Sequence, residues 1–141
     1  MAKYFRLSEL TYSETAYKNK IDNTPNAEER EHLEELMEFI DGFRAYWGGP
    51  LLVSSGFRCE ALNELVGGAK NSGHRYGWAV DFVPANNKKM ECYEKFQEYL
   101  KDKNFDELLL ERNSRGKIWL HFSLKSYQGK QRKKIKILEA K

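Results

Sequence analysis

The chain has 141 residues, of which 40% are hydrophobic and 32% are charged, and its net charge is +3. A chain of this length buries roughly 68% of its unfolded surface, so it needs neither disulfides nor a metal merely to fold. The composition excludes a disordered chain, and the charge is too small to indicate a nucleic-acid-binding protein by itself. No repeat or linker divides the sequence, so we expect a single domain over residues 1–141, with its core at about 7–125 and a basic C-terminal strand within 130–141.

The first third of the chain is expected to be helical. Residues 1–20 predict a turn or a short helix that packs on the rest of the molecule. A long helix should follow, capped by Asn26 together with Glu29 and terminated by the Gly-Gly-Pro sequence at 48–50. Its apolar residues recur at helical spacing and form one stripe, namely Leu33, Leu36, Met37, Ile40, Phe43 and Trp47. His32 lies beside this stripe and is expected to be an ordinary surface or boundary histidine.

Strands and helices alternate in the rest of the chain. The pattern predicts strands at 51–54, 78–83, 105–111 and 118–124, helices at 59–65 and 87–101, a glycine-rich loop at 66–77 and a hairpin turn at 113–116. The partial alternation at 134–138 suggests a last edge strand. Its lysines would block edge-to-edge aggregation, and attraction to an anionic cell envelope is the alternative. These blocks indicate an α+β domain, with a small antiparallel sheet flanked by helices.

The N-terminal sequence and the cysteines bear on the cellular setting. No apolar segment follows the first residues, so we expect no secretory signal and synthesis in the cytoplasm. No apolar run is long enough for a membrane span, so membrane insertion is not expected, and nothing demands more than a monomer. Cys59 and Cys92 are far apart and are expected to be reduced thiols, with a disulfide or a catalytic thiol as the alternatives.

Two of the predicted strands carry polar side chains suited to metal binding. Asp81 lies in a strand with apolar residues on both faces, where a carboxylate must be paired or bound to a metal. His121 lies on the opposite face of its strand from the apolar residues, and His74 precedes Asp81 by seven residues. Two imidazoles and a carboxylate suit a catalytic zinc ion, which keeps its fourth position for water. From the spacing alone, a satisfied core histidine and a salt-bridged aspartate remain the alternatives.

The neighbouring residues extend the pattern. The segments concerned are Ser54-Ser55-Gly56-Phe57-Arg58, Asn63, Val66-Gly67-Gly68-Ala69, the run from Ser72-Gly73-His74 to Ala79-Val80-Asp81, and Trp119-Leu120-His121-Phe122-Ser123. Together they resemble the zinc D-Ala-D-Ala carboxypeptidase family, peptidase family M15, subfamily A, whose zinc fold is shared by Hedgehog signalling domains. The segment from Phe105-Asp106 to Glu111 looks like the one that precedes the last zinc histidine in Hedgehog domains. The resemblance extends from Leu7 to about Lys125 and implies the Hedgehog/D-Ala-D-Ala peptidase fold with one catalytic zinc ion.

The resemblance also implies roles for individual residues. The zinc ligands would be His74, Asp81 and His121. Glu111 matches the general base, and Arg58 matches the arginine that contacts the carboxylate or the carbonyl oxygen of the substrate. Zinc lowers the pKa of a bound water from ~16 towards ~7, and a nearby carboxylate can take its proton.

Three further residues complete the candidate site. By resemblance, Ser72 would support the first ligand and contact the substrate. Trp119 stands where some relatives have a histidine two residues before the last ligand, and it is a substrate-binding candidate. Glu107 lies four residues before Glu111 on the same face of the predicted strand, so it is the alternative base.

The first functional hypothesis is a zinc D,D-carboxypeptidase or endopeptidase that acts on peptidoglycan stem peptides in cell-wall lysis or remodelling. A short domain of this kind without a signal sequence resembles phage or prophage endolysins, which act on the wall after release. The alternative is a catalytically inactive zinc-fold module that recognises cell-wall peptide, although Glu111 and Arg58 favour catalysis. A nucleic-acid-binding domain is a third hypothesis, but no recognised motif accompanies the basic residues and we expect no nucleic-acid partner. The sequence does not identify the bond that is cleaved.

Overall fold

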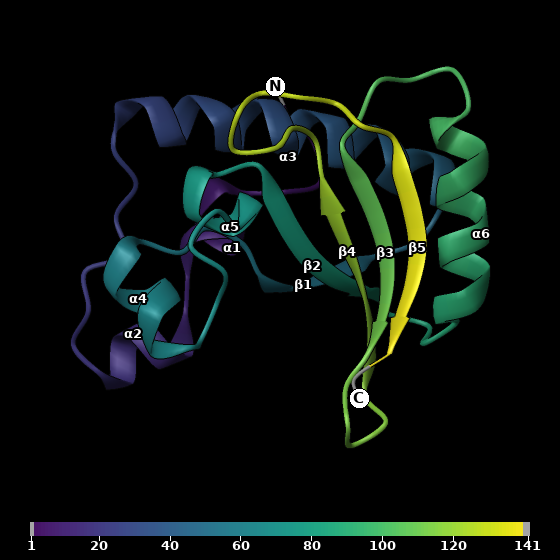
Figure 1. Ribbon diagram of the computed structural model, residues 1–141. Coiled ribbons are helices and arrows are strands. Elements are labelled where there is room, and N and C mark those ends of the chain that lie inside the picture. The colour runs from purple at the N-terminus through teal and green to yellow at the C-terminus, as the bar shows by residue number, and fades with distance from the viewer. Residues whose placement is uncertain (1, 140–141) are drawn as a thin grey trace.

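Two long helices cover one face of a five-stranded sheet (Figure 1). The structure is a computed structural model and describes residues 2–139. The strands are β1 (Leu51–Ser55), β2 (Ala79–Pro84), β3 (Glu107–Arg112), β4 (Ile118–Ser123) and β5 (Lys134–Glu139), and they lie side by side in the order β1-β2-β4-β3-β5. The long helices are α3 (Ala27–Trp47) and α6 (Lys89–Leu100). The prediction of an α+β fold is therefore confirmed.

The short helices gather at the end of the sheet nearest β1 (Figure 1). They are α1 (Leu7–Thr11), α2 (Glu14–Lys18), α4 (Glu60–Leu65) and α5 (Gly73–Tyr76). The prediction of a loop throughout 66–77 is wrong at α5. A single turn of helix forms there because the Ser72 hydroxyl accepts a hydrogen bond from the backbone of His74 and because Gly77 ends the turn.

The helix α3 begins and ends where the sequence predicts. The Asn26 side chain accepts from the backbone N–H of Glu29 at 2.8 Å, and the Glu29 carboxylate accepts from the backbone N–H of Asn26 at 2.9 Å. Gly48 ends the helix in the left-handed conformation, with a φ of 84°. The predicted stripe is buried at Leu33, Leu36, Ile40 and Phe43.

The core forms between these helices and alternate residues of the strands. Phe43 of α3 stacks on Phe96 of α6 with ring centroids 3.9 Å apart, and Phe96 stacks on Phe122 of β4 at 4.9 Å. The other strand residues on this face include Val80, Phe82, Leu108, Leu110 and Leu120. Because strand side chains alternate, the intervening residues of β2, β3 and β4 point to the face that α3 and α6 leave uncovered.

The sheet is mixed, whereas the sequence was expected to form an antiparallel one. The first four strands in the sheet order pair antiparallel, but β5 pairs parallel with β3, from Glu107 opposite Lys134 to Arg112 opposite Glu139. The reason is the path of the chain. Residues 124–133 leave the end of β4, cross the starting end of β3 and enter β5 in the same direction as β3. The backbone bonds from Lys133 N–H to Phe105 O and from Lys134 N–H to Asp106 O, 3.0 and 2.8 Å long, fix this crossing.

The two cysteines and His32 follow their expected roles. Cys59 and Cys92 are free thiols, the second of them buried. His32 is half-buried, stacks on Trp78 with ring centroids 4.0 Å apart, and places its Nδ1 2.7 Å from the carbonyl oxygen of Tyr76. Within residues 2–139, no helix combines the length and the apolar character needed to cross a bilayer.

Candidate metal centre

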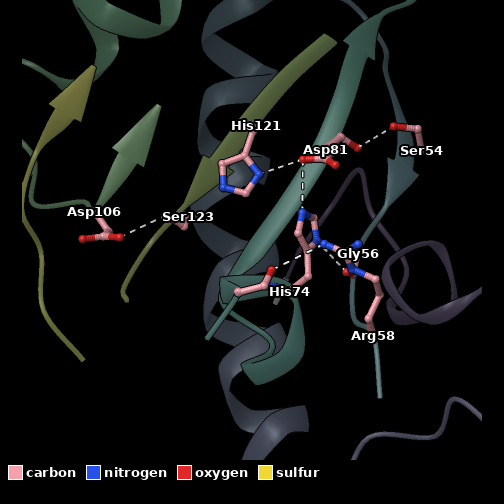
Figure 2. Close-up of polar contacts among 9 residues, drawn as sticks. Ser54, Gly56, Arg58, His74, Asp81, Asp106, His121 and Ser123 are labelled. Atoms are coloured by element: carbon pink, nitrogen blue, oxygen red, sulfur yellow. Dashed lines mark hydrogen bonds and ion pairs between the residues drawn. The ribbon is translucent and has the colours of Figure 1, made fainter. Parts of the chain in front are cut away.

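Three side chains converge where β2 and β4 lie side by side, on the face of the sheet away from α3 and α6 (Figure 2). Asp81 of β2 is paired directly with His121 of β4, and the Nδ1 of His121 is 2.8 Å from the Oδ1 of Asp81. The Nε2 of His74, on α5, is 3.2 Å from the same oxygen. One ligand atom from each residue lies within 4.8 Å of the others. The structure therefore brings together the three residues that the sequence predicted as a ligand set.

The backbone of α5 and β2 positions the first two of these side chains. Gly77 ends α5 with a φ of 81°, a conformation that favours glycine. A Cβ added there would lie 2.7 Å from the backbone oxygen of Glu29 in α3. Glycine thus allows a tight turn against α3, and the chain passes from His74 to Asp81 within seven residues.

A backbone carbonyl fixes the orientation of the buried His74 ring. The Nδ1 of His74 lies 2.8 Å from the carbonyl oxygen of Gly56 (Figure 2). A carbonyl only accepts hydrogen bonds, so Nδ1 carries a hydrogen, and Nε2 is the ring nitrogen that faces the cluster. Metal-binding histidines are commonly held in this way through the ring nitrogen that does not bind the metal.

The donor set fits a zinc ion. Tetrahedral zinc with bonds of about 2.0–2.2 Å to nitrogen and oxygen places its ligand atoms roughly 3.3 Å apart. The separation from Asp81 Oδ1 to His74 Nε2, 3.2 Å, is close to this value, and the one to His121 Nδ1, 2.8 Å, is shorter. Two imidazole nitrogens and one carboxylate oxygen are also the donor types that zinc accepts.

The two histidines keep the carboxylate of Asp81 ionised. Burial raises the pKa of Asp81, but the charges and hydrogen bonds of His74 and His121 outweigh it and hold this pKa below its usual value. Burial lowers the pKa of His121, but the hydrogen bond and charge of Asp81, together with the charge of Glu111, raise it overall. An ionised carboxylate is the form that binds a cation.

Both candidate bases lie on β3, diagonally across from His121. Glu107 pairs with Ser123 and Glu111 with Trp119, so they flank the position opposite His121, at about 7–8 Å by the geometry of diagonal neighbours. Glu107 forms an ion pair with Arg132 at 3.5 Å. Within residues 2–139, Glu111 forms no ion pair. The carboxylate of Glu111 is therefore more available than that of Glu107 to accept a proton.

Arg58 lies beside the cluster, on the side of β1 (Figure 2). Its Nη2 donates to the Ser72 hydroxyl at 3.4 Å, and its buried Nε has no hydrogen-bond partner among the described residues. Burial lowers the pKa of the guanidinium, and the charges of Asp81 and Glu111 oppose this effect. A buried donor without a partner, next to a cavity, is suited to an acceptor on a ligand.

Two cavities adjoin the cluster. The first, which we call the β1 cavity, has a volume of about 900 Å³ and lies between α1, α2 and β1, and Arg58 and Asp81 line it. The second, the C-terminal cavity, has a volume of about 530 Å³ and is lined by residues from 69–73 and 125–132, together with His121. Ser72 lines the C-terminal cavity.

Trp119 occupies a different place from the other candidates. It is half-buried and lies opposite Glu111 in the ladder of β3 and β4. It lines neither the β1 cavity nor the C-terminal cavity. Its buried Nε1 has no hydrogen-bond partner among the described residues, so any contact with a ligand would be made beside Glu111.

Two features of the site were not found from the sequence. One is the carbonyl of Gly56, which lies in a segment singled out only as part of a motif. The other is the ion pair of Asp106 with Arg132, at 2.8 Å, beside the C-terminal cavity. A signal for it existed, because Asp106 is a carboxylate between Phe105 and the apolar run of β3, but the partner lies 26 residues away.

The family model described as Peptidase M15 matches residues 3–123, and the chain belongs to this family. The match runs from before α1 to the end of β4 and leaves out residues 124–139, which form the connection to β5 and β5 itself. No curated protein matches the chain. The peptidases of this family are zinc-dependent, and the cluster of His74, Asp81 and His121 fits that requirement.

Proposed function

We propose that this member of the peptidase M15 family is a zinc metallopeptidase that hydrolyses peptidoglycan stem peptides, in cell-wall lysis or remodelling. The observation that carries the proposal is the convergence of two imidazole nitrogens on one oxygen of Asp81, at 2.8 and 3.2 Å. Zinc bound by His74, Asp81 and His121 would supply a Lewis acid and a water whose pKa is lowered to about 7.

Glu111 is the proposed general base. It is held on a strand, diagonally across from His121, and its carboxylate has no ion pair within residues 2–139. It takes a proton from the attacking water and passes it to the leaving amine. Glu107 serves this role less well because Arg132 holds its carboxylate.

Arg58 is the proposed anion-binding residue. Its guanidinium is partly buried next to Asp81, and its Nε is free to donate to an oxygen of the substrate. There it stabilises the negative charge that develops on the scissile carbonyl, or holds a carboxylate of the substrate. Ser72 orients the guanidinium through its hydroxyl, and Trp119 is a proposed substrate contact because it lies opposite Glu111.

The substrate class is proposed from the resemblance of residues 72–81 and 119–123 to the zinc D-Ala-D-Ala carboxypeptidases. On the same ground we propose that the protein acts on the bacterial cell wall, in the manner of phage or prophage lysis enzymes. Purified peptidoglycan and a defined stem pentapeptide are the substrates that test this. We expect new products by mass spectrometry that disappear with a chelator and return when zinc is added.

The variants Glu111→Gln and Glu107→Gln separate the two candidate bases. We expect Glu111→Gln to keep its zinc and to lose hydrolysis by about 10²–10⁴-fold, whereas Glu107→Gln should stay within a few-fold of the unsubstituted protein. Equal loss in both variants, or loss only in Glu107→Gln, would contradict the assignment. One bound zinc without cleavage of any substrate would instead favour the binding module, and no zinc at all would overturn the ligand set.

A further inference from the structure

The β1 cavity and the C-terminal cavity lie on either side of the candidate metal centre. Asp81 lines the first and His121 the second, and their side chains are 2.8 Å apart. Arg58 lines the first and Ser72 the second, and these two are joined by a hydrogen bond of 3.4 Å. Two pairs of touching residues therefore stand between the cavities, so the cluster has one cavity on each side.

Figure 2 shows residues that line the two cavities on either side of the cluster. Arg58 lies to one side of His121 and Asp81, and Ser123, which lines the C-terminal cavity, lies to the other. Each cavity falls in the range of about 300–1,000 Å³ that is typical of sites enclosing a small ligand. A peptide bond placed over the cluster thus has room for further residues in both directions along the chain.

An ion pair between Arg132 and Asp106 holds the outer wall of the C-terminal cavity, residues 125–132, against the sheet. The Nε and the Nη2 of Arg132 each donate to the carboxylate of Asp106 at 2.8 Å, and the backbone N–H of Arg132 donates to it at 3.2 Å. Asp106 is 1% exposed. The wall, residues 125–132, lies beyond residue 123, where the family match ends, so this side of the site is built in part by a segment that the family model does not describe.

We infer that the protein is an endopeptidase whose substrate peptide occupies both cavities, rather than a carboxypeptidase. The inference rests on the proposed function. A carboxypeptidase closes its site one residue beyond the scissile bond, where it holds the terminal carboxylate. Here the cluster has a cavity of about 900 Å³ on one side and one of about 530 Å³ on the other, and each has room for more than one residue. Water adds its oxygen to the acyl carbon of an internal amide, the C–N bond breaks, and the new amine takes the proton, so both products keep several residues.

Stem peptides of one sequence with free or blocked ends test the inference directly. We expect the enzyme to cut an internal bond in a peptide that is N-acetylated and C-terminally amidated, at a rate within a few-fold of that for the free peptide. Release of only the last residue from the free peptide, with no cleavage of the amide, would overturn the inference and leave the proposed function intact. Cleavage of no peptide and no peptidoglycan would overturn both.

Filling each cavity in turn provides a second test. Thr15 lines the β1 cavity and Asn71 the C-terminal cavity, and both are exposed and away from the ligand set. We expect Thr15→Trp and Asn71→Trp each to lower kcat/KM for the blocked peptide about tenfold or more, mainly through KM, which corresponds to about 1.4 kcal/mol of binding.

The matched controls are Glu31→Phe and Asn104→Phe, which add a ring at exposed positions that line neither cavity and should stay within about twofold. Zinc content and thermal unfolding of all four variants confirm that the fold and the cluster are retained. If either tryptophan variant cleaves the blocked peptide at the unsubstituted rate, the substrate does not pass through that cavity and the inference is wrong.

Discussion

The substitution Asp106→Asn is expected to destabilise the protein in a way that depends on pH. The buried carboxylate of Asp106 accepts two hydrogen bonds of 2.8 Å from the guanidinium of Arg132 and one of 3.3 Å from the Ser123 hydroxyl. Asparagine keeps one acceptor oxygen, but it removes the charge and turns an amide group towards these donors. The Arg132 guanidinium then keeps only the carboxylate of Glu107, at 3.5 Å, as a counter-charge among the described residues.

The expected loss in the free energy of unfolding depends on how exposed Arg132 is. Removing one member of a fully buried ion pair costs about 3–5 kcal/mol. The Arg132 side chain is 40% exposed, so water can solvate its charge once the pair is broken. We therefore expect a loss of about 2–3 kcal/mol in the free energy of unfolding, which lowers Tm by roughly 8–12 °C for a chain of this length.

The pH dependence has a defined sign. Burial raises the pKa of Asp106, but the hydrogen bonds and charge of Arg132 outweigh it and lower this pKa from its ordinary value. A carboxylate whose pKa is lower in the folded state contributes stability above its unfolded pKa of about 3.9, and loses it as the pH falls through the folded value. The difference between the variant and the unsubstituted protein should thus be full at neutral pH and shrink below about pH 4.

Thermal unfolding followed by circular dichroism at neutral and acid pH measures both the loss of stability and its pH dependence. Asp102→Asn is the matched control, because Asp102 is exposed and its ion pair with Lys103, at 3.1 Å, lies at the surface, and it should not change Tm measurably. A variant Asp106→Asn that unfolds with the unsubstituted protein at pH 7 would refute the reasoning. So would a difference that persists unchanged in acid.

Three further predictions concern single positions. A Cβ at Gly56 would clash with the backbone carbonyl of Leu10, so Gly56→Ala should displace the carbonyl oxygen that accepts from His74. We expect zinc binding to weaken about 10–100-fold in a competition with a chromogenic chelator. Unchanged affinity would show that the Gly56 carbonyl does not support His74 as a ligand. Burial raises the pKa of Cys92 to about 12, so this thiol should react with a disulfide reagent at pH 8 only after unfolding, and rapid reaction in the native protein would show that it is accessible. Phe96→Ala removes a ring that is 0% exposed and should cost about 3–5 kcal/mol in urea unfolding, a prediction that fails if the midpoint hardly moves.

Local patterns in the sequence were sufficient for the elements that carry the ligands. The alternation of apolar residues in 118–124 placed His121 on the face opposite the core, and the structure confirms this register. In 78–83 the alternation put Asp81 on the other face from Trp78, Val80 and Phe82, but both faces read as apolar. The capping pair of Asn26 and Glu29 predicted the start of α3 because both hydrogen bonds span only three residues. Such signals depend on neighbours along the chain, so the sequence displays them directly.

Features that depend on the path of the chain could not be predicted. The alternation at 134–138 indicates a strand but not its direction, which is set by the crossing of residues 124–133 past β3. Arg132, the partner of Asp106, lies within a run of basic residues, and the sequence does not show which of them pairs with Asp106. The helix α5 was missed because four residues in a glycine-rich segment give no helical periodicity.

The direct pairing of Asp81 with His121 has a consequence for how a metal ion would enter and leave. Both residues belong to neighbouring central strands, so the hydrogen bonds of the ladder hold their backbones at a fixed separation before any ion arrives. The rate of metal uptake should therefore be limited by the loss of water from the ion rather than by a rearrangement of the protein. For the same reason, one divalent ion should replace another without moving the strands, so a coloured ion such as cobalt would report faithfully on the coordination of the native site.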